Sequence, residues 1–299
     1  MSLLDDHLRA PEAQRTETSS PRLTRRRGWA NVRTWPVSLR VGVAVFAAVL
    51  LVLALTPWIA PHDPTAQDLA ARLAPPGGEH LLGTDQLGRD VLSRLMDGGR
   101  FSVSIAAITL AISALSGTLI GIVCARRGGA LDEFVMRLSD VLLAFPEIIV
   151  AMFLVSVLGA NYLTLVLALV ISGWTPFARL ARGLALEVSA RDFVEAARAL
   201  GCSKSFIVFR HVLPNVLGPL LAHAATRFGH KLITVGALSF LGLGVQPPDA
   251  DWGSMLADGQ PYLTRASWLV IYPGLAIFAT ALSITLIGQG INARRSSRG

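Results

Sequence analysis

Three basic side chains lie close together within one strongly apolar stretch. Arg227, His230 and Lys231 are spaced i, i+3 and i+4, so a helix would present them on one face. Ionisable groups at membrane depth are costly and usually face a cavity or a partner. The spacing indicates either a cationic patch for the carboxylate of a passing peptide or metal chelate, or charges that pair with a partner helix or reach water. Asp140 and Glu147 flank the start of another apolar stretch, where we expect ion pairs with nearby arginines.

Other reactive residue types are sparse and scattered. We find no Ser/His/Asp arrangement and no carboxylate pair, so we predict no catalytic centre. Cys124 and Cys202 lack metal-site spacing, and His62 and His80 are isolated, so we predict no metal site. The sequence contains no G-x-x-x-x-G-K-[ST] motif, and the fragment 201–205 lacks its Gly-Lys pair. We therefore expect no cofactor in this chain.

The composition predicts an all-α integral membrane protein. The chain of 299 residues is 52% hydrophobic and 16% charged, against about 25% charged in soluble domains. Its net charge of +7 comes mainly from arginines between apolar segments, which favours contact with a lipid bilayer over nucleic acid. About 20 apolar residues cross the hydrocarbon core as a helix. Six segments fit: Ser38–Ile59, Phe101–Val123, Phe134–Leu158, Tyr162–Ala181, Val216–Leu241 and Trp268–Ile291.

The basic residues predict the orientation of these spans. Alternate connections hold 20 and five Lys plus Arg, and the richer set includes both termini. The positive-inside rule then places both termini in the cytoplasm. We expect the end of the external connection, Asp90–Arg100, to form a separate amphipathic helix on the outer surface. The predicted parts are a disordered tail 1–38, a first transmembrane helix 39–60, an extracytoplasmic segment 61–98, a core 99–290 and a cytoplasmic tail 291–299.

The internal loop 189–214 predicts two short helices separated by a turn. Ser189 is placed as an N-cap with Asp192 three residues later. Gly201 is placed to end the first helix in a left-handed conformation. Ser203 is placed to cap a second helix that ends before Pro214.

The first of these helices carries an apolar face of partly small residues. Phe193, Ala196, Ala197 and Leu200 follow helical spacing. Small residues let the backbone of a partner approach closely. The pattern alone fits equally a helix that lies on the inner membrane surface.

The same loop resembles a known motif. Glu195-Ala196-Ala197, then Gly201, then Leu213-Pro214 is similar to the EAA loop of ABC importer permeases. His211 stands where isoleucine is usual, and the stretch 209–215 resembles the dipeptide, oligopeptide and nickel branch, in which histidine is familiar here.

Two further stretches resemble the C-type permeases of that branch. They are Gly83-Thr-Asp-Gln-Leu-Gly-Arg-Asp-Val-Leu-Ser-Arg94, and Leu238-Ser-Phe-Leu-Gly-Leu-Gly244 with Gln246-Pro-Pro248 and Asp251-Trp-Gly253. Together the resemblance covers about residues 35–292.

The resemblance implies a six-span permease of the type I importer fold in a bacterial cytoplasmic membrane. Its partners would be a B-type permease in a heterodimer, two cytoplasmic ABC ATPases that hold ATP and magnesium, and an extracytoplasmic solute-binding protein. Residues 195–197, Gly201, His211, Leu213 and Pro214 would form the ATPase coupling site, with Glu195 as a polar contact and Gly201 as the turn.

The cargo stays open at this point. The branch imports dipeptides and oligopeptides, and similar sequences import nickel, metallophores or glutathione. An ion-coupled secondary carrier is a different class, but it would need acidic residues deep in several spans, and these are nearly absent.

Overall fold

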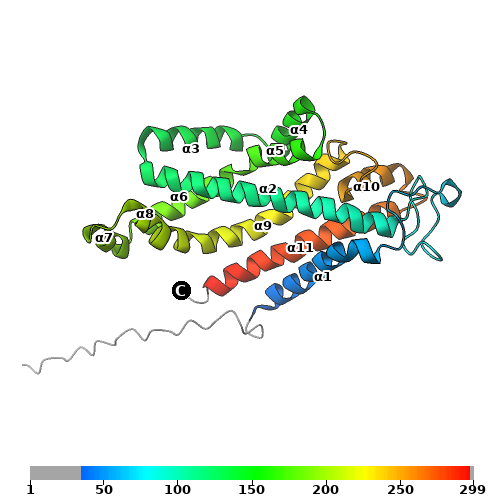
Figure 1. Ribbon diagram of the computed structural model, residues 1–299, viewed down its shortest axis with the longest axis horizontal. Coiled ribbons are helices and arrows are strands. Elements are labelled where there is room, and N and C mark those ends of the chain that lie inside the picture. The colour runs from blue at the N-terminus through cyan, green and yellow to red at the C-terminus, as the bar shows by residue number, and fades with distance from the viewer. Residues whose placement is uncertain (1–34, 297–299) are drawn as a thin grey trace, which may run out of the picture. The chain divides into compact units, whose positions relative to one another are not determined.

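The computed structural model describes residues 35–296, and within them every regular element is helical (Figure 1). The predicted tail 1–38 lies almost wholly outside the described residues, as do residues 297–299. The main helices are α1 (Val37–Ile59), α2 (Val91–Arg127), α3 (Gly129–Leu143), α4 (Glu147–Leu158), α5 (Tyr162–Gly173), α6 (Thr175–Ser189), α7 (Asp192–Ala199), α8 (Lys204–Ile207), α9 (Leu213–Phe240), α10 (Trp252–Gly259) and α11 (Trp268–Ser296). Single turns occur at η2 (Leu69–Ala71), η3 (Val208–Val212) and η4 (Gln260–Tyr262).

Five of the helical stretches are long and apolar enough to cross a membrane, and a bent pair makes a sixth. The five are Val37–Ile59, Val91–Arg127, Tyr162–Ser189, Lys204–Phe240 and Trp268–Ile291. Many large apolar side chains on them are exposed, which suits contact with lipid. The expected number of spans is thus reproduced, with differences in two of them.

The prediction of the third span as one helix, Phe134–Leu158, is wrong. The structure has α3 and α4 instead, bent by 89° at a short break. Pro146 causes the break, because proline lacks an N–H and pushes the preceding Phe145 out of the helical region. The break exposes the start of α4 to neighbours on other helices.

The separate surface helix expected at Asp90–Arg100 is also wrong. These residues form the first turns of α2, which continues for 37 residues without a break. The Asp90 carboxylate accepts a hydrogen bond from the Ser93 N–H and so caps the helix. Gly99 allows Trp252 of α10 to pack here, since a Cβ would lie 2.6 Å from its ring. Burial against α10 therefore replaces the expected surface position.

Small residues bring α2 and α6 together along much of their length. Gly117 and Gly121 lie one turn apart on α2, a spacing that lets helices approach closely in membranes. A side chain at Gly121 would collide with the carbonyl of Ala178 and lie 2.9 Å from the Ala181 Cβ. The other long helices pack as α1 on α11 and α9 on both α2 and α11.

We predict that Gly121→Val destabilises the protein by about 1–3 kcal/mol, the usual cost of overpacking a tight contact. Thermal unfolding in detergent should show a lower midpoint than the wild type. The matched control is Gly183→Ala on α6, where a Cβ meets nothing within 4 Å. It should unfold no earlier than the wild type, since alanine favours helix. A Gly121→Val protein as stable as Gly183→Ala would contradict the packing.

Candidate functional site

The segment from α7 to η3 has the predicted glycine turn at its centre. Gly201 has φ +76°, and its N–H donates to the Arg198 carbonyl at 2.9 Å. The Cys202 N–H donates to the Ala197 carbonyl at 3.1 Å. These two bonds form a Schellman cap, a common glycine-terminated end of a helix. The predicted left-handed end of the helix at Gly201 is therefore confirmed, and its part in ATPase coupling stays a prediction.

The N-terminal cap of α7 differs from the expectation. Ser189 is the last residue of α6, and α7 begins after Arg191, whose side chain makes no cap bond. Helix α6 thus runs further than the capping pattern indicated, because Val188 at its end is buried in the apolar cluster beneath α7. Ser203 does cap the second helix as predicted, accepting from the Phe206 N–H at 3.2 Å.

The second helix does not end before Pro214. Helix α8 passes through the π turn η3 directly into α9. Pro214 lies in the first turn of α9, and its missing N–H leaves out one backbone hydrogen bond where η3 passes into α9. The π turn η3 joins α8 to α9 without a gap, so the three elements form one continuous helical segment.

The buried face of α7 is not the predicted apolar face, since Phe193, Ala196 and Leu200 are exposed. Val194 and Ala197 are buried, and with Ile207 and Val212 they share one apolar cluster with α6 and α9. Ala197 therefore belongs to the packed side, while Ala196 and Glu195 are exposed. The segment is fixed to the bundle through this cluster.

Four large apolar side chains of the segment are exposed instead of buried in this cluster. We call them the α7–α8 patch: Phe193, Leu200, Phe206 and Phe209, with Leu200 83% exposed and Phe209 70% exposed. His211 lies between two of them, with ring centroids 5.8 Å from those of both Phe193 and Phe206. The structure thus places predicted residue His211 at the centre of the patch and leaves Leu213 half-buried beneath it.

Inside the bundle, Lys231 of α9 meets Glu147 at the start of α4. Lys231 is 3% exposed, and its ammonium donates to a Glu147 carboxylate oxygen and, at 2.8 Å, to the Leu169 carbonyl of α5. A side chain at Gly173 would collide with the ammonium, so this glycine makes room for it. Lys231 is therefore committed to Glu147 and is no free member of a cationic patch.

The other two predicted basic residues remain available. His230 is half exposed, and its Nε2 lies 3.7 Å from the second Glu147 oxygen. Arg227 is half-buried and forms no ion pair with any described residue. Asp140 pairs with Arg179 at 3.1 Å, as expected, whereas Glu147 pairs with a lysine instead. Sequence reasoning placed Glu147 near a boundary and missed its partner.

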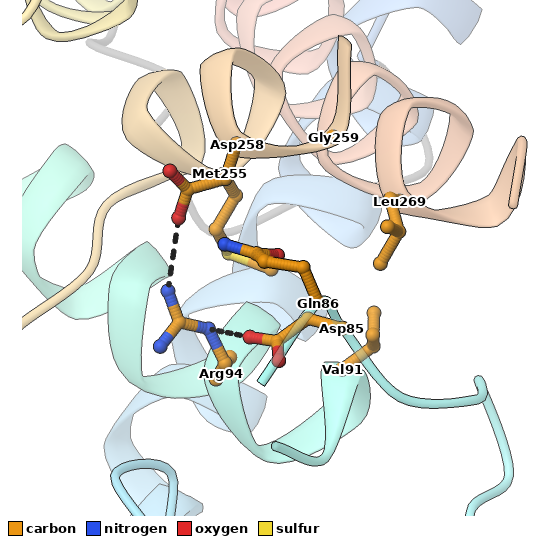
Figure 2. Close-up of a pocket in the computed structure, with 8 residues that line it drawn as sticks. All are labelled: Asp85, Gln86, Val91, Arg94, Met255, Asp258, Gly259 and Leu269. Atoms are coloured by element: carbon orange, nitrogen blue, oxygen red, sulfur yellow. Dashed lines mark ion pairs between the residues drawn. The ribbon is translucent and has the colours of Figure 1, made fainter. Parts of the chain in front are cut away.

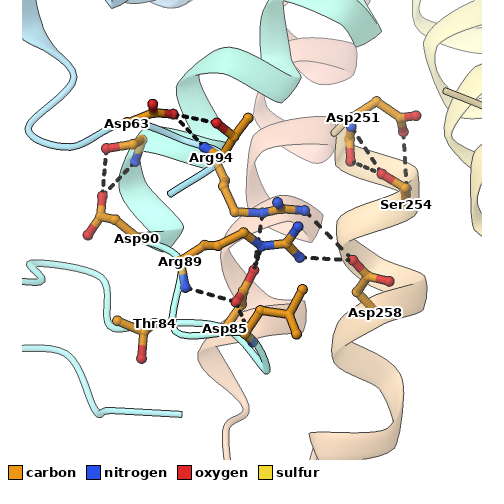
Figure 3. A network of polar contacts seen from close by, with 12 residues as sticks. Asp63, Thr84, Asp85, Arg89, Asp90, Arg94, Asp251, Ser254 and Asp258 are labelled. Carbon is orange, nitrogen blue, oxygen red and sulfur yellow. Dashed lines mark hydrogen bonds and ion pairs between the residues drawn. The ribbon is translucent and has the colours of Figure 1, made fainter. Parts of the chain in front are cut away.

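Four charged side chains join the start of α2 to α10 at the other end of the bundle. Figures 2 and 3 show Arg94 between Asp85 and Asp258, with distances of 3.3 and 3.7 Å. Arg89 bonds the same Asp85 oxygen at 2.7 Å. The hollow beside Arg94 measures about 10 Å³, roughly the room that one water needs. The cluster therefore fixes structure and is too small to hold a transported solute.

Comparison with protein families agrees with this architecture. Residues 117–297 match the family described as binding-protein-dependent transport system inner membrane component. Residues 39–76 match the N-terminal transmembrane domain of oligopeptide transport permease C. The two matches together include residues from all the helical spans described above.

Individual relatives are similar over most of their length. The di/tripeptide transport system permease of Pseudomonas aeruginosa is 39% identical over 84% of this chain and 85% of its own. The nickel transport system permease of Escherichia coli is 35% identical over 85% of this chain and 92% of its own.

Solved structures share the fold at low sequence identity. A methionine ABC transporter in inward-facing conformations aligns with a TM-score of 0.55 at 18% identity, covering 68% of this chain and 96% of that one. An amino acid ABC transporter aligns with a TM-score of 0.53, covering 68% and 94%. The chain belongs to the family of binding-protein-dependent transport system inner membrane components, and it is a multi-pass permease subunit of an ABC importer.

Proposed function

We propose that this chain forms half of a membrane pathway for short peptides, driven by partner ATPases that bind its α7–α8 patch. The observation that carries the proposal is the two-sided α7–α8 segment. One side is buried in the bundle core, and the other presents exposed aromatic and aliphatic side chains. Exposed apolar surfaces of this kind mark interaction sites.

The rigidity of the segment supports a mechanical role. Its buried side chains pack with those of α6, and η3 continues directly into α9. Packed interiors transmit displacement because they contain few voids. Movement of a partner against the patch would therefore move α9. Because Lys231 of α9 pairs with Glu147, the bent pair α3–α4 would move with it. ATP and magnesium would be held by the ATPases and not by this chain.

The expected topology places the patch on the ATPase side. The basic residues around it agree with a cytoplasmic location under the positive-inside rule, with both termini on that side of a bacterial cytoplasmic membrane. The second half of the pathway would be a B-type permease, and a solute-binding protein on the other side would deliver cargo.

Peptide cargo is supported by relatives and by the remaining charges. The Pseudomonas relative is named a di/tripeptide permease, and α9 offers the Arg227 guanidinium and, beside it, the His230 ring as hydrogen-bond donors that suit a peptide carboxylate. The nickel permease of Escherichia coli keeps a metal or metal chelate as the second candidate.

Leu200→Asp should weaken association with the ATPase partners at least about tenfold, since a charge would have to be desolvated at the contact. Co-purification of the ATPases with the tagged full-length chain measures this. Leu200 is so exposed that the fold should be unaffected. Leu81→Asp is the matched control, an exposed leucine in the connection between α1 and α2. If Leu200→Asp retained wild-type association, the patch would not be the ATPase contact.

Gly201→Val should strongly reduce uptake, because a β-branched residue at positive φ costs about 1–2 kcal/mol and tilts the turn that orients the patch. Gly201→Asn is the control, since asparagine tolerates this conformation and the site has room for a side chain. Uptake by the assembled importer in vesicles is the measurement. Equal uptake by both variants would show that the turn geometry is unimportant.

Arg227→Gln should lower uptake of a dipeptide with a free C-terminal carboxylate several-fold more than uptake of its C-terminal amide. Arg227→Lys keeps the charge and should restore most of the difference. Equal losses for both substrates would remove Arg227 from cargo recognition. Uptake of nickel with no peptide uptake would favour the second candidate while leaving the coupling experiments unaffected.

A further inference from the structure

Two histidines and an aspartate that are separate in the sequence meet beside the start of α2. His62 follows α1, His80 closes a tight turn with Gly77, and Asp90 caps α2. The Nδ1 of His80 lies 2.9 Å from an Asp90 oxygen, and the Nδ1 of His62 lies 3.7 Å from the same oxygen. One ligand atom from each residue lies within 4.8 Å of the other two. The expectation that these histidines are isolated is therefore wrong, because the connection between α1 and α2 folds back on itself.

A hydrogen bond between His80 and Asp90 satisfies only part of this cluster. The His62 Nδ1 is buried and has no hydrogen-bond partner within the described residues. Buried polar atoms without protein partners are rare, and those that occur are commonly satisfied by water or a bound ion. The two imidazole rings also lie close, with centroids 4.8 Å apart. A cation here would accept the lone pair of the His62 nitrogen and would take the place of the proton that the His80 Nδ1 shares with Asp90.

The cluster is held in place by Ser93. Its N–H and hydroxyl both donate to the second Asp90 oxygen, each at 2.8 Å, and its hydroxyl oxygen accepts from the backbone N–H of His62 at 3.1 Å. Ser93 therefore orients the Asp90 carboxylate and holds the backbone of His62 beside it. Such outer contacts are typical of metal sites, where they fix ligand orientation.

The donor set indicates the kind of ion. Imidazole nitrogens suit zinc, nickel, copper and iron, whereas magnesium and calcium prefer oxygen ligands throughout. Zinc binds His nitrogen and Asp oxygen at about 2.0–2.2 Å, so the two ring nitrogens and the Asp90 oxygen, now within 4.8 Å of one another, would have to close around the ion. The His62 side chain is 38% exposed and that of His80 is 19% exposed, so an ion here would keep access to water.

We propose that His62, His80 and Asp90 bind one divalent transition-metal ion of the zinc or nickel type, with water in the remaining position. The ion would tie the end of α1 to the start of α2. It is a resident ion and not cargo, so the proposal is independent of which solute the importer carries.

Metal binding can be measured on the full-length chain, purified in detergent with its partner permease through a tag that contains no histidine. After chelation, the protein is titrated with zinc, nickel and magnesium, and bound metal is counted by mass spectrometry. We expect one zinc or nickel ion per chain and no magnesium. Replacement of His62 by alanine should abolish stoichiometric binding, and Ser93→Ala should raise the Kd about tenfold or more.

His62→Ala is the decisive variant, because its ring makes no hydrogen bond in the described structure and the His80–Asp90 contact would survive. Asp63→Asn is the matched control, an exposed neighbour whose carboxylate accepts hydrogen bonds from the N–H and hydroxyl of Thr65. It should bind metal like the wild type. Absence of a stoichiometric ion in the wild type, or unchanged binding in His62→Ala, would overturn the proposal and leave the proposed transport function intact. Binding of magnesium as tightly as zinc would also overturn it.

Discussion

The ion pair between Lys231 and Glu147 holds the bent α3–α4 pair against α9 within the apolar part of the bundle. A buried charge costs several kcal/mol unless it is paired and hydrogen-bonded. The Leu169 carbonyl supplies a second acceptor for the lysine, and Gly173 leaves the space that its ammonium occupies. Glu147 is accessible to it only because Pro146 breaks the span directly before it. The bend and the ion pair therefore depend on each other.

Helix α9 connects this ion pair to the α7–α8 segment. The π turn η3 runs into α9 without a gap, and the cluster beneath the segment includes side chains from α2, α6 and α9. A displacement of the α7–α8 segment would thus be transmitted along α9 and, through the Lys231–Glu147 ion pair, to the bent α3–α4 pair. At the other end of the bundle, paired arginines and aspartates fix the start of α2 to α10. The two ends are therefore built differently, with an open apolar contact at one and a closed polar network at the other.

The features that could be predicted from the sequence are those that neighbouring residues determine. Gly201 and Ser203 occupy their predicted roles because a left-handed cap and an N-cap involve only residues within one or two turns. The number of spans follows equally from local hydrophobicity. The extent of α6 does not follow from local signals, because Val188 packs in a cluster whose other members come from distant segments.

The features that the sequence did not show arise from contacts between distant residues. Lys231 and Glu147 are 84 residues apart, and the residues around each of them do not indicate which partner it pairs with. Pro146 predicts a break in the span, but its sequence neighbours do not reveal that the two helices meet at a bend of 89°. The proximity of His62 and His80 could not be predicted either, because it depends on how the irregular connection between α1 and α2 folds.

The loss of Lys231 from the predicted cationic patch changes how cargo recognition must be understood. With Lys231 committed to Glu147, the predicted patch on α9 keeps Arg227, which forms no ion pair with a described residue, and His230, whose Nε2 lies 3.7 Å from a Glu147 oxygen. One arginine can attract a carboxylate but reads little else about a solute. In the proposed transport function, a pathway that this subunit lines so sparsely would suit a broad class of solutes, and selection among them would come from the surfaces of the proposed partner subunits.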